Sequence, residues 1–125
     1  MTFRETLDKH LKAIQDRDLR SLIETLPDEK LTLVMSDGRL VETVREFIEL
    51  HRGWFEMTTW TMQSQIVSLH EAQRMGCATI HLEYRDESPD GSKILETSYL
   101  TLVFALQGDR WAMILDQNTP IRARG

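Results

Sequence analysis

The chain of 125 residues is poor in the features that mark secreted and membrane proteins. It has one cysteine, Cys77, so no disulfide can form within the chain. A single thiol is typical of a reducing compartment, and we expect a cytoplasmic protein. No apolar run approaches the roughly 18 residues that cross a bilayer. The N-terminus is charged from Arg4 onward and lacks the apolar core of a secretion signal. We therefore expect no contact with a membrane.

Positive charge and cofactor motifs are also scarce. Fifteen Lys and Arg residues face 20 Asp and Glu residues, which gives a formal net charge of −5. Nucleic-acid-binding proteins usually carry a basic patch, so we expect no nucleic-acid partner. The four histidines show no His-x-x-x-His pair on one helix, and the chain has no glycine-rich phosphate loop or dinucleotide fingerprint. We expect neither a metal nor a cofactor.

The first half of the chain predicts three helices and one short hairpin. Apolar residues at helical spacing define the first helix, which carries Phe3, Leu7, Leu11 and Ile14. Asp18 is a suitable N-cap for a second, shorter helix. A strand over Leu31–Met35 leads into a turn at Asp37-Gly38, and we expect this strand at the edge of a sheet. Thr43 followed by Glu46 has the pattern of a capping box at the start of a third helix.

The second half predicts a long antiparallel meander. Turn signals separate four runs of strand character, at Thr59–Glu71, Met75–Asp86, Lys93–Gln107 and Arg110–Asn118. Helices followed by strands with short connections indicate an α+β fold. With no linker or repeat in the sequence, we expect one domain over residues 1–125. The predicted architecture is a cone, with three N-terminal helices on a curved, mostly antiparallel sheet.

Strand alternation divides this predicted sheet into two faces. The apolar face carries Ile80, Leu82, Leu100, Leu102, Phe104, Trp111 and Met113. We expect a second subunit to cover it, because a large exposed apolar patch usually marks an interface. Simple alternation places polar groups together on the other, mixed face, namely His81, Tyr99, Thr101, Asp116 and Asn118. Convergent polar groups suit the wall of a pocket, so we expect a small apolar or aromatic molecule to bind there.

Three segments carry a resemblance to a known superfamily: "AIQDRDLRSLIETLPDEKLTLVMSDGR", "TVREFIELHRGWF" and "DRWAMILDQNTP". Their order and spacing resemble the nuclear transport factor 2-like superfamily, in its polyketide cyclase (SnoaL-like) and ketosteroid isomerase-like branch. The resemblance implies a cystatin-like cone with a cavity between helices and sheet, and frequent dimers. It covers enzymes, binding modules and kinase-association domains alike, so function depends on the site.

The resemblance supplies one candidate for acid/base catalysis. The parts of a steroid isomerase site (a carboxylate base, a tyrosine on the first helix and a protonated acid) have no counterparts at the expected positions. Related cyclases use an aspartate in the closing strand, and Asp116 falls near that position. Burial would raise its pKa, as proton transfer requires; alternatively, Asp116 is a solvated residue at a strand end. His81 is either its catalytic partner or a structural histidine.

Residues of the third helix and the following turn complete the predicted site. His51 lies on the buried side of the helix, and Trp54 and Trp60 bracket the turn. The aromatic rings either stack on a planar ligand at the mouth of the cavity or close the end of the core. The leading hypothesis is a small-molecule-binding domain, in the form of a cyclase- or isomerase-like enzyme with an acid/base Asp116. The alternative is a non-catalytic dimerisation or association module.

Overall fold

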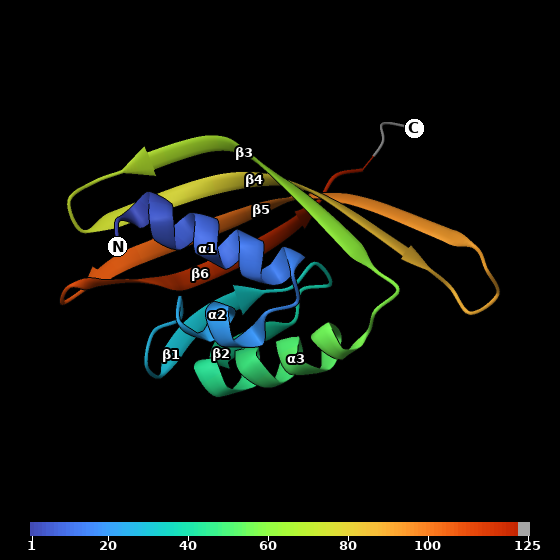
Figure 1. The fold of residues 1–125 in the computed structure, drawn as a ribbon. Helices are drawn as coiled ribbons and strands as arrows, with labels where there is room; N and C mark the ends of the chain where they lie inside the picture. Colours follow the sequence, from blue (N-terminus) through green and yellow to red (C-terminus); the bar gives the residue numbers. More distant parts are fainter. Residues whose placement is uncertain (123–125) are drawn as a thin grey trace.

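The computed structural model describes residues 1–122 and confirms the α+β fold (Figure 1). As the sequence predicts, three helices and a short hairpin occupy the first half of the chain, and four long strands occupy the second half. The elements are α1 (Phe3–Gln15), α2 (Leu19–Ile23), β1 (Lys30–Val34), β2 (Leu40–Thr43), α3 (Val44–Glu56), β3 (Thr61–Glu71), β4 (Met75–Glu87), β5 (Lys93–Gln107) and β6 (Arg110–Pro120). Among residues 1–122, no helix has the length and apolar character needed to span a bilayer.

Each helix begins at a polar cap that the sequence provides. Thr2 and Glu5 form a complete capping box at α1, with each side chain bonded to the backbone of the other residue. Asp18 accepts a hydrogen bond from the Ser21 amide at α2, as predicted. Thr43 accepts from the Glu46 amide at α3. These bonds satisfy amides that have no partner within the helix, and so define where each helix starts.

The strands form one sheet of six, in the order β2-β1-β6-β5-β4-β3. Strand β1 pairs in parallel with β6, and every other pair is antiparallel. The prediction that the strand near Leu31–Met35 lies at the edge is therefore wrong. Strand β2 forms the edge instead, because it pairs with the side of β1 that does not contact β6.

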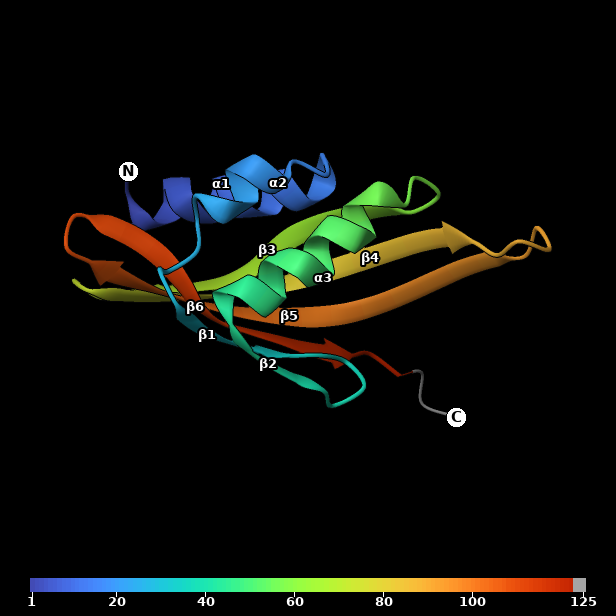
Figure 2. The same cartoon turned by 90° about the horizontal axis from the view of Figure 1, so that it is seen from below.

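All three helices lie on one face of the sheet (Figure 2), here called the inner face. The inner face is the predicted apolar face, and its residues are buried: Ile80, Leu82, Leu100, Leu102, Phe104, Trp111 and Met113. Phe3 and Leu7 of α1 pack against them, and the Phe3 ring meets those of Phe104 and Trp111 at 5.7 and 5.6 Å. The expectation that a second subunit covers this face is wrong, because the helices cover it.

A β-bulge in β6 changes which side chains reach the inner face. Phe104 pairs with Met113 and Leu102 pairs with Asp116, so β6 places one extra residue between the two pairs. At this point the Met113 amide donates a hydrogen bond to the carbonyl of Thr25, 2.8 Å away. Met113 and Asp116 therefore lie on the same face although three positions separate them. Simple alternation would have placed Asp116 on the opposite, outer face.

Candidate functional site

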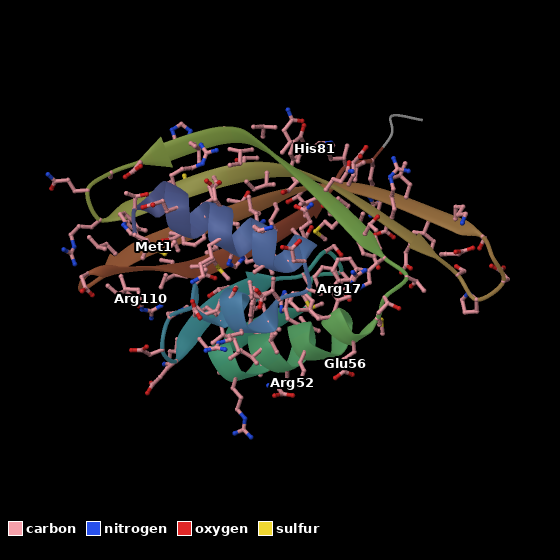
Figure 3. The ribbon with its side chains drawn as sticks, in the orientation of Figure 1. Met1, Arg17, Arg52, Glu56, His81 and Arg110 are labelled. Carbon is pink, nitrogen blue, oxygen red and sulfur yellow. The ribbon has the colours of Figure 1, made fainter. Side chains whose placement is uncertain are left out.

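The structure divides the predicted site residues between the two faces. His81, Tyr99 and Thr101 lie on the outer face, which no helix covers. His81 pairs with Tyr99 across β4 and β5, with their rings 5.8 Å apart in an edge-to-face arrangement. Tyr99 is 43% exposed. Figure 3 shows His81 on the sheet, away from the helices.

Asp116 and Asn118 lie on the inner face, so the prediction that they join His81 and Tyr99 is wrong. Asn118 pairs with Leu100 and Asp116 with Leu102, both of which are covered by the helices. The β6 bulge is the physical reason, because it shifts the alternation of the strand by one residue. His81 therefore cannot act as the direct partner of Asp116, since the sheet separates them.

Asp116 is buried on this inner face without a hydrogen-bond partner for its Oδ1 atom within residues 1–122. Burial raises the pKa of the Asp116 carboxyl from 3.8 to about 7. A carboxylate in an apolar environment loses its hydration, and so the protonated form is favoured. Near neutral pH the group can therefore both accept and release a proton, as a general acid/base must.

A buried histidine that sequence reasoning did not include belongs to the same face. His10 of α1 is fully buried, and its ring meets Phe104 edge-to-face at 5.7 Å. Its Nδ1 atom lies 2.7 Å from the Thr25 hydroxyl, and this hydroxyl lies 2.6 Å from the carbonyl of Leu22. Its Nε2 atom has no partner within the described residues. His10 follows Phe3 and Leu7 along the α1 stripe, and this spacing was the signal that could have identified it.

His51 lies in the helical layer, as predicted, but packs inside it. Its Nδ1 atom lies 2.8 Å from the carbonyl of Phe47, and the two rings stack at 3.9 Å. Burial lowers the pKa of His51 from 6.5 to about 4. Burial also lowers the pKa of His10, to about 3, with a smaller contribution from repulsion by a charge on His51. Both imidazoles are therefore neutral at physiological pH.

The aromatic residues after α3 form a closed stack. Trp60 is fully buried and stacks on Trp54 at 4.1 Å, while its indole donates to the Trp54 carbonyl at 3.0 Å. The Arg17 guanidinium lies 4.3 Å above the Trp60 ring and donates to the carbonyls of Trp60 and Met57. Arg17 thus joins the end of α1 to the end of α3 (Figure 3). Trp60 is therefore part of the hydrophobic core.

Side chains fill most of the space between the helices and the sheet. A cavity of about 10 Å³ remains, lined by Leu11, Ile14, Gln15, Met62, Ser64, Leu82 and Leu100. This volume corresponds to about one water molecule. A larger ligand does not fit in this cavity unless the residues that line it move. Within residues 1–122, no three His, Cys, Asp or Glu side chains are grouped in a way that could hold a metal ion.

The sequence model of the SnoaL-like domain family matches residues 4–117 of the chain. No curated protein sequence matches the chain.

Several solved structures share the fold at low sequence identity. A proposed calcium/calmodulin-dependent protein kinase type II association domain from Thiobacillus denitrificans has a TM-score of 0.80 at 13% identity, over 97% of this chain and 96% of that one. A ketosteroid isomerase-like protein from Erwinia carotovora has a TM-score of 0.79 at 14% identity, over 96% and 94%. The CaMKII association domain of C. elegans has a TM-score of 0.69 at 18% identity, over 93% and 91%.

Proposed function

We infer that this chain, which belongs to the SnoaL-like family of the nuclear transport factor 2-like superfamily, binds a small uncharged carbonyl compound and catalyses proton transfer on it. One observation carries the proposal: Asp116 is buried on the inner face, and its Oδ1 atom has no partner within residues 1–122. A buried polar group without a partner costs stability, so its presence calls for an explanation such as a ligand.

The reaction follows from the properties of Asp116. Its carboxylate form takes a proton from the carbon next to the carbonyl group, which leaves an enolate. Its carboxyl form then returns the proton to carbon, so the group ends as it began. A pKa of about 7 supports both steps near neutral pH. The apolar residues around Asp116, including Leu33 and Leu102, favour an uncharged and largely apolar substrate.

Hydrogen–deuterium exchange at the carbon next to the carbonyl of cyclohexanone tests this proposal directly. NMR in D₂O should show faster exchange with the protein than with buffer alone. Asp116→Asn keeps the shape of the side chain but cannot transfer the proton, so we expect a loss of about 10²-fold or more. The matched control is Asp109→Asn in the exposed β5–β6 turn, which should keep the wild-type rate. Equal exchange by wild type and Asp116→Asn would overturn the proposal.

The second candidate function is association of two copies through the outer face of the sheet. Two observations favour it: the cone is nearly filled with side chains, and two of the similar structures are described as association domains. A continuous row of side chains crosses four strands of this uncovered face, namely Gln65, His81, Tyr99 and Thr119. A second copy of the chain would bury this face and leave the helices free.

Sedimentation at micromolar concentration tests the association. The wild-type protein should sediment as a dimer. Thr101→Arg introduces a charge near the centre of the outer face, next to Thr79 and Gln117, and should yield a monomer. Ser92→Arg in the exposed β4–β5 turn is the control and should remain dimeric. A wild-type monomer would contradict this candidate and leave the proposal for Asp116 untouched.

A further inference from the structure

The hydrogen bonds of His10 determine which of its ring nitrogens carries the proton. The Thr25 hydroxyl lies 2.6 Å from the Leu22 carbonyl, and a carbonyl oxygen can only accept. The single hydroxyl proton of Thr25 is therefore used in that bond. Toward His10, 2.7 Å away, the Thr25 oxygen can act only as an acceptor, so the Nδ1 atom of His10 must donate. The neutral ring then carries no proton on Nε2.

We propose that His10 is a second ligand-binding residue, which Thr25 holds in the tautomer that leaves Nε2 free to accept a hydrogen bond from a hydroxyl group of the ligand. This inference rests on the proposed function, since it names the class of compound that the Asp116 site takes. Thr25 acts as a positioning residue, because it orients His10 without contact to the ligand. The selected compound is an uncharged carbonyl compound that also carries a hydroxyl group.

The location of His10 supports a shared site with Asp116. The ring of His10 packs against Phe104, and Phe104 and Leu102 are neighbouring inner-face residues of β5. Leu102 is in turn the cross-strand partner of Asp116. His10 thus packs on Phe104 and Asp116 pairs with Leu102, the next inner-face residue of β5, and within residues 1–122 both His10 Nε2 and Asp116 Oδ1 are buried without a hydrogen-bond partner. A small molecule over these two positions could engage both.

The chemistry of the interior narrows the ligand further. His10 cannot stabilise a negatively charged oxygen, because its free nitrogen has no proton to donate. His51 is held in the same tautomer, since its Nδ1 atom donates to the carbonyl of Phe47. Both rings are neutral at physiological pH, so a charged ligand would find no counter-charge on them. The free Nε2 acceptor of His10 favours a ligand that offers a hydrogen-bond donor, and a hydroxyl is a small group of this kind.

NMR of the imidazole nitrogens in the ligand-free protein tests the first half of the proposal. The His10 resonances should show a protonated Nδ1 and an unprotonated Nε2. Thr25→Val removes the acceptor and should release the ring into a mixture of tautomers, whereas Thr25→Ser retains the hydroxyl and should keep the wild-type spectrum. A wild-type ring with its proton on Nε2 would overturn the inference, whatever the activity of the protein.

A matched pair of probes tests the second half. NMR titration should show that at least one ring isomer of hydroxycyclohexanone binds wild type about 10-fold more tightly than cyclohexanone does, as one added hydrogen bond allows. His10→Phe keeps the ring that packs on Phe104 but should abolish this preference. His70→Phe, the same substitution on the outer face, should retain it. Equal affinity of wild type for all probes would overturn the role of His10 and leave the Asp116 proposal standing. Absence of binding by every probe would overturn both.

Discussion

The two faces of the sheet have opposite characters although the same strands build them. The inner face is apolar and covered by helices, and within residues 1–122 two side chains there carry a buried atom without a hydrogen-bond partner, His10 above the sheet and Asp116 on it. The outer face carries His81, Tyr99 and Thr101, and no helix covers it. Polar residues are ordinary on an exposed face, where water satisfies them at little cost. The same residue types on the covered face are exceptional and point to function.

Titration of the inner-face groups gives the first and largest test of this contrast. The pKa of His10 is about 3 in the folded protein and near 6.5 in the unfolded chain. Between these values the unfolded state binds the proton, so the His10 contribution to the free energy of unfolding should decrease as the pH is lowered from about 6.5 to 3, by on the order of 5 kcal/mol. His10→Phe should remove this acid sensitivity in urea unfolding, whereas His70→Phe on the outer face should retain it. If the free energy of unfolding depended on pH in the same way for wild type and His10→Phe, His10 would not be the source of the acid sensitivity, and the contrast between the two faces would fail.

Asp116 should give a slightly smaller effect with the opposite sign. Its pKa is about 7 in the folded protein against 3.8 for an exposed aspartate, so the folded state retains the proton between these values. The Asp116 contribution to stability is full at acid pH and falls as the pH rises from about 4 to 7, by on the order of 4 kcal/mol. We expect Asp116→Asn to unfold at higher urea than wild type at pH 8. Glu83→Gln on the outer face should make no such difference, and a destabilised Asp116→Asn at pH 8 would argue against an ionised, buried carboxylate.

Two leucine truncations compare the packing of the faces. Leu102 is fully buried on the inner face, whereas Leu115 lies half-buried on the outer face. Leu102→Ala leaves a cavity in the core and should lower the free energy of unfolding by about 3 kcal/mol. Leu115→Ala should cost about 1 kcal/mol in the monomer, because less apolar area returns to water. Urea unfolding of dilute protein measures both, and similar losses would show that the outer face is packed as well.

The smallest effect is expected for His81 on the outer face. Its ring contacts Tyr99, and it remains half-buried in the absence of a covering layer. His81→Ala should change the free energy of unfolding by less than about 0.5 kcal/mol, as is usual for a surface site. A loss of several kcal/mol would place His81 in a structural role. A weakened dimer with unchanged monomer stability would sharpen its assignment to the association surface.

Local signals in the sequence were sufficient for most of the elements. The Thr43–Glu46 cap and the turn after Gln107 predict element boundaries, because they depend on nearby residues only. The third long strand, Lys93–Gln107, has the predicted bounds, while β6 continues to Pro120 beyond the predicted end at Asn118. The prediction that a second subunit covers the apolar face was wrong, because sequence periodicity does not reveal on which face of the sheet the helices pack.

The sequence by itself determined the α+β order, the two-sided pattern of the strands and the family. Each follows from spacing within a short segment or from the succession of segments. Only the tertiary structure decided the composition of the site. The extra residue in β6 is fixed by its pairing with β5 and by the bond from the Met113 amide to Thr25, a partner far away in the sequence. That bulge turns Asp116 to the covered face, and the same Thr25 bonds to His10 there. Contacts between distant segments, which no local pattern encodes, therefore brought the two buried groups to one face.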